Sequence, residues 1–357
     1  DTSKRKPVNA VKRSKSRRKA RRKSRNRGKV KDKDKGGSPL IIAAASLVGL
    51  ALVMVMTVLI LTYVGANSMT DDGSGVNTAA AGADSYGDGT ISYKGRFYKY
   101  NKNVSSILFV GVDKNDKNES ISNGNDSQAD VNVLAVIAPT NKKLVLISIS
   151  RDTICEIEVF DENGNSEGTA KAQLALSYSY GDGAEKSCEL TTEAVSKIFY
   201  DISIPAYGSM YMDGIVDLVN AVGGVTVTSD GQTVNLDGKQ AKDYIHYRSH
   251  DVEGNDERME RQSQVIKALV YKAIASAKSD PKSILDIYDA VKDNTTTNLN
   301  AAKIVYLAQQ AAKLDFNGDV NKVPGHSEAG EQNHAEYIIN EEAFFKLILN
   351  TFYIPVM

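Results

Sequence analysis

Several common functional signatures are missing from this 357-residue chain. It has no Walker phosphate loop and no Gly-x-Gly-x-x-Gly fingerprint, which excludes P-loop nucleotidases and Rossmann dinucleotide enzymes by motif. It has only two cysteines, and they do not form a Cys-x-x-Cys pair. A redox or cysteine-nucleophile function is therefore not expected.

Charged residues are absent from residues 36–70, and residues 40–66 read LIIAAASLVGLALVMVMTVLILTYVGA. A helix of this length reaches about 40 Å, which exceeds the hydrocarbon core of about 30 Å. The run is too long for the apolar part of a cleaved signal peptide, which spans roughly 7 to 15 residues. We therefore expect a transmembrane helix at 39–66.

The first 38 residues carry 18 lysines and arginines and only three acidic residues, although the whole chain has no net charge. The positive-inside rule keeps such a tail in the cytoplasm. We expect a single-pass protein of the plasma membrane with a disordered tail at 1–38 and an extracellular C-terminal domain. The tail has no aromatic residues with which to stack on bases, so anionic membrane lipids are its expected partner and nucleic acid is not.

The part after the apolar run divides into three by composition. Residues 67–90 contain almost no large apolar residue, which predicts a flexible extracellular linker. Residues 91–278 are predicted to form an α/β domain, because apolar strands at 105–112, 131–138 and 143–150 precede helical patterns at 170–181, 190–202 and 256–278. Residues 279–357 are predicted to form a helical extension packed on that domain, with helices near 281–292 and 301–313.

The two cysteines, Cys155 and Cys188, both fall in the part expected outside the membrane. Disulfides persist in such a compartment, so the pair permits one disulfide. Two buried free thiols are the alternative, and the sequence leaves both open.

Charged residues gather where the predicted strands and helices begin or end. Asp113 follows the first apolar strand, Asp130 precedes the second, and Arg151-Asp152 follows the third. The helix near 256 carries Arg258, Arg261 and Gln262 in its first two turns, and Arg248 lies just before it. Polar residues at strand ends are often only surface residues, so composition alone assigns them no function.

Five segments in a fixed order give these residues a context: SISRDT (148–153), AQLALSYSYGDG, VNAVGGVTV, LDGKQAKDYIHYR and NDERMERQ. Together they resemble the LytR-CpsA-Psr family of cell-envelope proteins over residues 105–275. The resemblance implies an α-β-α sandwich around a central mixed sheet, here preceded by one transmembrane helix. It also implies a phosphotransferase that moves a teichoic-acid-like or capsule-like glycopolymer from a polyprenyl-pyrophosphate-linked donor to peptidoglycan, with an apolar groove for the lipid.

The resemblance also assigns roles to residues. It implies that Asp113 and Asp130 hold Mg²⁺, and that arginines and a glutamine bind the pyrophosphate: Arg151, Arg248, Arg258, Arg261 and Gln262. The residue types suit this chemistry, because guanidinium groups bind phosphate oxygens in pairs and Mg²⁺ prefers carboxylate and phosphate oxygens. Arg151, Arg248, Arg258 and Asp152 are the expected catalytic residues. Asp152 either activates the acceptor hydroxyl or orients Arg151.

Four positions depart from the family pattern. Gln128 and His246 stand where arginines are usual in the substrate site, Ser150 replaces a proline, and Asn255 replaces an aspartate. Two missing guanidinium groups imply weaker donor binding or a donor of different charge. They also leave two other functions open: a non-catalytic membrane-anchored binder of lipid-linked glycan or cell wall, and a cell-envelope transcriptional attenuator.

Overall fold

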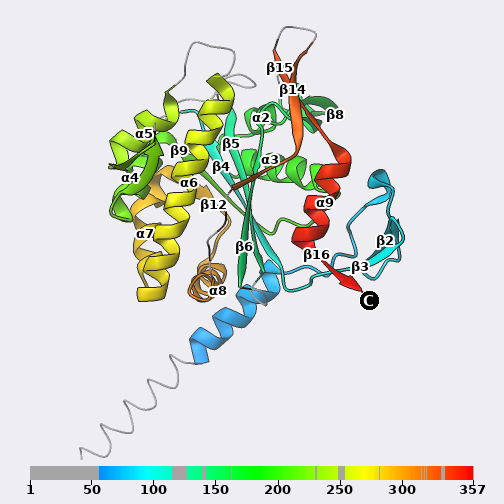
Figure 1. The fold of residues 1–357 in the computed structure, drawn as a ribbon, viewed down its shortest axis with the longest axis horizontal. Helices are drawn as coiled ribbons and strands as arrows, with labels where there is room; N and C mark the ends of the chain where they lie inside the picture. Colours follow the sequence, from blue (N-terminus) through cyan, green and yellow to red (C-terminus); the bar gives the residue numbers. More distant parts are fainter. Residues whose placement is uncertain are drawn as a thin grey trace, which may run out of the picture. The chain divides into compact units, whose positions relative to one another are not determined.

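The computed structural model describes residues 56–357 except 115–126, 139–141, 162, 230, 248–253, 281, 315, 317, 319, 331–333 and 357. Its centre is a six-stranded sheet in the order β12-β9-β4-β5-β6-β13 (Figure 1). These strands are β4 (Ser105–Val112), β5 (Ala129–Ala138), β6 (Lys143–Ile149), β9 (Ala206–Tyr211), β12 (Thr295–Thr297) and β13 (Val320–Lys322). The β4–β9 and β6–β13 pairs are parallel and the other pairs are antiparallel, so the sheet is mixed as expected.

The central strands are apolar on both faces because helices cover both faces. In β4, Leu108 and Val110 belong to one hydrophobic cluster, whereas Ile107 belongs to the cluster on the opposite face. A strand buried on both sides reads as a continuous apolar run rather than an alternating one. This explains why the sequence predicted the three strands β4, β5 and β6 close to their observed bounds.

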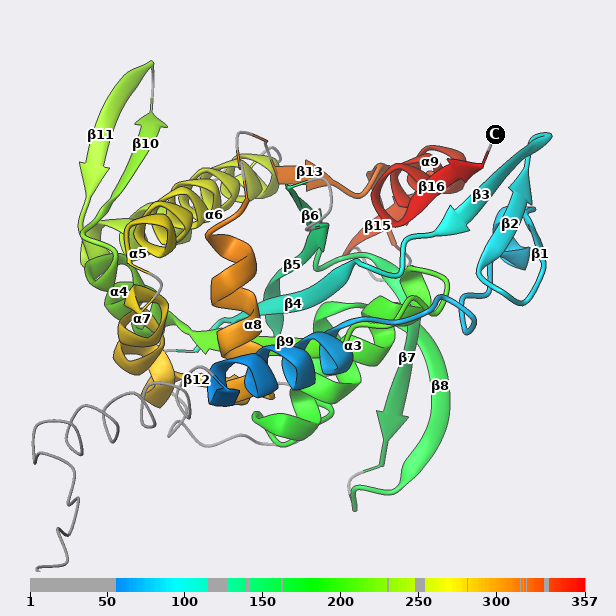
Figure 2. The same cartoon turned by 90° about the horizontal axis from the view of Figure 1, so that it is seen from below.

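Two helical layers enclose the sheet (Figures 1 and 2). One layer consists of α2 (Ala175–Ser179), α3 (Glu185–Ile198) and α9 (Glu341–Phe352), and the other of α6 (Gly254–Ser279) and α8 (Ala301–Ala311). A third cluster beside α6 contains α4 (Met212–Ala221), α5 (Gly238–His246) and the hairpin β10 (Val225–Ser229) and β11 (Gln232–Leu236). Helix α7 (Ser283–Val291) packs on α4 and is followed by the 3-10 turn η3 (Lys292–Asn294).

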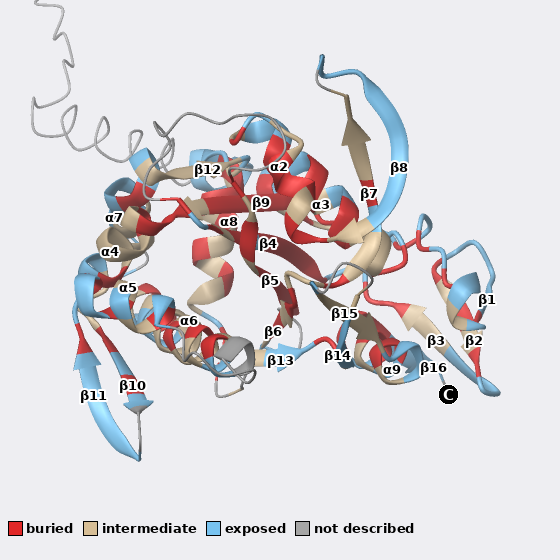
Figure 3. Ribbon diagram, turned by 90° about the horizontal axis from the view of Figure 1, so that it is seen from above, coloured by how far each residue is buried: buried red, intermediate tan, exposed pale blue. Residues whose placement is uncertain are grey.

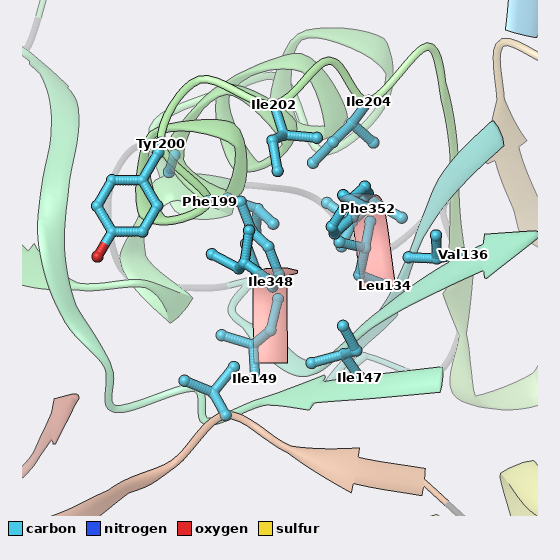
Figure 4. Close-up of a cluster of buried hydrophobic side chains, with 14 of the residues drawn as sticks. Leu134, Val136, Ile147, Ile149, Phe199, Tyr200, Ile202, Ile204, Ile348 and Phe352 are labelled. Carbon is cyan, nitrogen blue, oxygen red and sulfur yellow. The ribbon is translucent and has the colours of Figure 1, made fainter. Parts of the chain in front are cut away.

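Aromatic side chains dominate the layer between the sheet and α9. Phe199 and Phe344 meet edge to face with ring centroids 5.0 Å apart, and Phe199 and Phe352 are fully buried. Figure 4 shows Phe199, Ile348 and Phe352 facing Leu134 and the other sheet residues of this cluster. Helix α9 is therefore part of the core although it lies near the end of the chain.

Smaller sheets surround the core. The first joins β1 (Asp84–Ser85), β2 (Thr90–Tyr93) and β3 (Arg96–Tyr100) to β16 (Tyr353–Val356), and its β2–β3 hairpin turns at Lys94-Gly95. The 3-10 turn η1 (Ala79–Ala81) precedes β1. Two hairpins follow: β7 (Ile154–Phe160) with β8 (Ser166–Gln173), and β14 (Gly325–Ala329) with β15 (Ala335–Ile339). Figure 3 shows that much of β8 and β11 is exposed, in contrast to the buried central strands.

The expected flexible linker at 67–90 is wrong as a description of this segment. Met69 is fully buried in the cluster that contains Ile107, and Val76 and Ala83 belong to the main cluster. The Asn77 amide also donates a hydrogen bond of 2.8 Å to the carbonyl oxygen of Tyr200. A few well-placed apolar residues anchor the segment, so its polar composition did not reveal the packing.

Residues 56–69 form a helix that lies against α8. The contact is close at Gly65, where a Cβ atom would collide with the carbonyl oxygen of Ala302 and lie 2.7 Å from Cβ of Tyr306. Gln309 of α8 donates a hydrogen bond of 2.8 Å to the hydroxyl of Thr62. The helix is thus fixed to the domain by a glycine contact and a polar contact.

The predicted transmembrane helix at 39–66 falls mostly on residues outside those described. Among the described residues, no helix combines the length and the apolar character needed to cross a bilayer.

The boundary predicted at 278 does not separate two domains. β12 pairs with β9 at one edge of the central sheet and β13 pairs with β6 at the other, so the C-terminal residues complete the sheet. The helix predicted at 170–181 is also partly wrong, because residues up to Gln173 belong to β8 and only α2 is helical. Alanine-rich β8 is exposed and pairs with β7, so tertiary pairing overrides its helix propensity.

Candidate functional site

A small pocket opens where β5 begins and β6 ends, beside the start of α6. Its lining includes charged and amide side chains from all three elements: Asp130, Asn132, Arg151, Asp152, Arg258 and Gln262. The β4–β5 register shifts at Gly111/Val112, one pair before the ladder ends at Val112 and Ala129. Such a bulge bends a strand and redirects its last side chains, here next to the pocket.

Two arginines converge on the buried carboxylate of Asp130. Arg151 donates from Nη1 to Oδ1, and Arg258 donates from Nη1 to Oδ2 at 3.2 Å. The Asp130 side chain is only 2% exposed and that of Arg258 is 8%, whereas Arg151 is 22% exposed. The carboxylate therefore fixes the direction of both guanidinium groups, and Arg151 keeps part of its surface toward solvent.

Gln128 contacts the same arginine. Its side-chain oxygen accepts a hydrogen bond from Nη2 of Arg151. An arginine at this position, usual in the resembled family, would place a second positive charge there instead. Position 128 therefore carries a neutral hydrogen-bond acceptor for Arg151 instead of a second cationic group.

Asp152 lies on the other side of Arg151. Its Oδ1 atom is 3.6 Å from Nε of Arg151 and accepts a hydrogen bond of 3.1 Å from Nε2 of Gln173. Burial raises the pKa of the Asp152 carboxyl above its ordinary value, and the positive charges of Arg151 and Arg258 act against that rise. The same oxygen of Asp152 thus faces both Arg151 and Gln173, which places it to orient the Arg151 guanidinium.

Helix α6 supplies the second arginine and the glutamine. Arg258 and Gln262 are four residues apart, so they lie on one face of the helix, and both are at most 9% exposed. Arg261 lies elsewhere: its Nη2 donates a hydrogen bond of 2.7 Å to the carbonyl oxygen of Tyr247, and its guanidinium stacks over the Tyr247 ring at 5.2 Å. The structure thus does not place Arg261 in the pocket, although the sequence predicted a substrate-binding role.

The other residues predicted for the site do not line the pocket or lie outside the described residues. Asp113 is exposed just after β4, and its amide donates a bond of 3.4 Å to the carbonyl oxygen of Gln128. His246 is exposed at the end of α5 and does not line the pocket. Arg248 lies outside the described residues.

The two carboxylates predicted for Mg²⁺ lie at the same end of the sheet. Asp113 follows β4 and Asp130 is the second residue of β5, and these strands pair up to Val112 and Ala129. No group of three His, Cys, Asp or Glu side chains suited to a metal occurs within the described part of the chain. Mg²⁺ commonly takes one or two protein carboxylates and completes its shell with phosphate and water, so the type and number of these residues suit the ion. Asp113 is exposed, whereas an ion at Asp130 would share that carboxylate with Arg151 and Arg258.

Both cysteines are free thiols in the structure, with Cys188 buried and Cys155 partly buried. Cys188 is fully buried, and burial raises the pKa of its thiol to about 11. Burial likewise raises the pKa of Cys155 to about 12. Neither thiol is suited to nucleophilic chemistry at neutral pH.

Sequence reasoning missed Gln173. It stands at the end of β8, where the sequence predicted the first turn of a helix, and its partner Ala335 is 162 residues away in the chain. A wider hollow lies beside the first residues of β9, lined by Glu189, Glu193, Tyr207 and Asn298 among others. That hollow has no basic lining residue, so it does not suit an anionic ligand.

A mixed α/β sandwich with paired arginines at one end of its sheet defines a domain suited to an anionic ligand. The model of the LytR_cpsA_psr family matches residues 69–348. This protein therefore belongs to the LytR-CpsA-Psr family, as the sequence motifs indicated.

Named relatives support this assignment. The polyisoprenyl-teichoic acid–peptidoglycan teichoic acid transferase TagU of Oceanobacillus iheyensis is 31% identical over 238 residues, which cover 64% of this chain and 69% of the relative. The TagU of Enterococcus faecalis is 30% identical over 234 residues, covering 62% and 69%. The crystal structure of protein gbs0355 from Streptococcus agalactiae superposes with a TM-score of 0.57 at 24% identity, covering 70% of this chain and 86% of that one. The last comparison confirms the mixed α/β fold.

Proposed function

We propose that this protein transfers a phosphate-linked glycopolymer from a polyprenyl-pyrophosphate carrier to peptidoglycan. Its family and the transferase names of its relatives support this function. The observation that carries it is the convergence of Arg151 and Arg258 on one buried carboxylate beside a small pocket. Oriented guanidinium groups are the side chains best suited to a pyrophosphate.

The reaction forms one phosphorus–oxygen bond and breaks another. A hydroxyl oxygen of the acceptor attacks the phosphorus that carries the sugar, and the bond from that phosphorus to the bridging oxygen breaks. Polyprenyl phosphate leaves with the electron pair, and the hydroxyl proton passes to solvent or to a carboxylate. Arg151 and Arg258 neutralise the charge of the phosphates, which is the main requirement of phosphoryl transfer.

Arg151 has five N–H groups, and the structure directs three of its nitrogens at protein acceptors. Nη1 faces Asp130, Nη2 faces Gln128 and Nε faces Asp152. Each Nη atom carries a second hydrogen, so two N–H groups are left for phosphate oxygens. We assign Asp152 the orienting role on this ground.

Mg²⁺ is part of this proposal. Asp113 and Asp130 would hold it, because they lie at the same end of neighbouring strands. The ion would supply positive charge to the pyrophosphate oxygens. Arg151 and Arg258 would bind the same group from the side of β6 and α6.

The lipid part of the donor would bind against the sheet. Phe109 lies in the central strand β4 but is 47% exposed. Its neighbour on β9 is Gly208, where an added Cβ atom would meet nothing closer than 3.8 Å. A polyprenyl chain needs an apolar surface of this kind. The predicted transmembrane helix and the cationic tail would keep the domain at the membrane that delivers the donor.

A release assay tests the function. The full chain in detergent micelles is given a polyprenyl-pyrophosphate-linked saccharide, Mg²⁺ and a peptidoglycan fragment, and polyprenyl phosphate is quantified. Arg151→Met should lower the release rate about 100-fold, as loss of one oriented charge-stabilising donor does. Arg96→Met, an exposed arginine on β3, serves as the matched control and should leave the rate unchanged. Wild-type release no greater than that of Arg151→Met would refute the proposal.

Binding without turnover is the second candidate, and Gln128 favours it because it replaces an expected cationic group. Donor binding with no release at any Mg²⁺ concentration would establish this alternative. Gln128→Arg should then raise donor affinity, since it adds a guanidinium group at the pocket.

A further inference from the structure

One side-chain amide links the pocket to a hairpin that is distant in sequence. Nε2 of Gln173 donates hydrogen bonds to Oδ1 of Asp152 at 3.1 Å and to the carbonyl oxygen of Ala335 at 2.7 Å. Gln173 is the last residue of β8 and Ala335 is the first of β15. Both hydrogens of this amide are therefore used, and they connect Asp152 to the β7–β8 hairpin and the β14–β15 hairpin.

The backbone of Asp152 is held independently. Its carbonyl oxygen accepts a bond of 2.8 Å from the amide of Tyr337, and Thr153 forms a parallel bridge with the same tyrosine. The Tyr337 hydroxyl in turn donates to the carbonyl oxygen of Val323 at 2.6 Å. Strand β15 thus fixes where Asp152 lies, and the Gln173 amide fixes where its carboxylate points.

We propose that Gln173 is a positioning residue of the transfer site, an inference that rests on the function proposed above. Its amide holds the Asp152 carboxylate against Nε of Arg151, 3.6 Å away, and so keeps the guanidinium plane turned toward the donor phosphate. Without this bond the carboxylate is free to rotate away. Arg151 would then keep its contacts with Asp130 and Gln128 but lose the third contact that fixes its plane.

The carboxylate of Asp152 lies among several charged groups. Arg151 precedes it, Arg258 faces it from α6, Asp130 from β5, and His334 from the residue before β15. Gln173 is the neutral donor in this set. Because its N–H group stabilises the ionised carboxylate, replacing it with an apolar side chain raises the pKa of Asp152 further.

The test measures how inorganic pyrophosphate binding depends on pH. Its Kd for the full chain in detergent is measured by calorimetry between pH 4 and pH 8, and the inflection that disappears in Asp152→Asn is assigned to Asp152. Gln173→Met should move this inflection up by about one pH unit, as expected for loss of one bond to a carboxylate. Gln173→Asn, whose amide is too short to span both acceptors, should move it the same way but less.

Thr169→Val is the matched control, because Thr169 is an exposed residue on the same face of β8. It should leave the inflection in place. A general loss of stability in Gln173→Met would weaken binding at every pH without moving the inflection, and this result would overturn the proposal. So would a wild-type profile without an Asp152 inflection, or no pyrophosphate binding. A shifted inflection in a protein that never releases polyprenyl phosphate would refute the transfer function and leave the positioning role in place.

Discussion

The substitution Asp130→Asn tests the charge cluster most sharply. It keeps the size of the side chain but removes the negative charge that faces Arg151 and Arg258. The Asp130 side chain is 2% exposed and that of Arg258 is 8%, so water cannot replace the lost partner well. Breaking a buried ion pair by removing one partner costs about 3–5 kcal/mol. The contact with Arg151 counts for less, because Arg151 is 22% exposed.

We therefore expect Asp130→Asn to lower the free energy of unfolding by about 3 kcal/mol. Urea unfolding of the full chain in detergent measures this loss. Asp113→Asn is the matched control, because this carboxylate lies at the same end of the sheet but is exposed. It should change the free energy by no more than about 0.5 kcal/mol.

Pyrophosphate should restore part of the lost stability. In Asp130→Asn the two guanidinium groups lack their shared carboxylate, and a bound anion takes its place. A ligand at 100 times its Kd stabilises the folded protein by about 2.7 kcal/mol. The rise in Tm at a fixed pyrophosphate concentration should thus be larger for Asp130→Asn than for the wild type. A stability loss equal to that of Asp113→Asn, or an equal rise in Tm for Asp130→Asn and the wild type, would show that Asp130 does not hold the two guanidinium groups.

Three further predictions follow from the packing and burial. Gly65→Leu should release the helix at 56–69 from α8 and speed its amide hydrogen exchange. The exposed neighbour Val64→Leu should not change the exchange rate, and equal rates in the two variants would contradict the close contact. Burial raises the pKa of Asp152, so the folded state binds its proton more tightly and stability falls as pH rises from the ordinary carboxyl pKa through the raised one. Asp152→Asn should therefore be more stable than the wild type at pH 7 and equal to it at pH 3, and a loss at pH 7 in urea unfolding would contradict this. Cys155 and Cys188 should resist maleimide until the protein unfolds, and a mass shift of the native protein would show that a thiol is accessible.

The central strands were predictable because burial on both faces leaves a local signal. The runs at 105–112, 131–138 and 143–150 are mostly apolar and rich in valine and isoleucine, and their length of eight residues favours strands over helices. Packing of the segment 67–90 left no such signal, since it depends on single residues such as Met69 that enter a core formed elsewhere. Strands β13 and β14 also left no signal, because they are short, polar and largely exposed.

The candidate site shows the same contrast between residues that lie in recognisable sequence motifs and residues that depend on long-range contacts. Arg151 and Arg258 were found because they lie in ordered motifs, and the structure brings both to Asp130. The position of Arg261 was not predictable, because its contact with Tyr247 depends on how α5 approaches α6. Gln173 gave no signal at all, since its two acceptors, Asp152 before β7 and Ala335 on β15, are distant in sequence.

Transfer itself is tested most directly by following phosphorus in the products. The full chain is incubated with a polyprenyl-pyrophosphate-linked saccharide, Mg²⁺ and a peptidoglycan fragment, and ³¹P NMR resolves donor and products. If the protein catalyses the transfer, the pyrophosphate signals are replaced by equal amounts of polyprenyl monophosphate and of a phosphodiester joining the saccharide to the fragment. Intact pyrophosphate, or monophosphates without a phosphodiester, would contradict it.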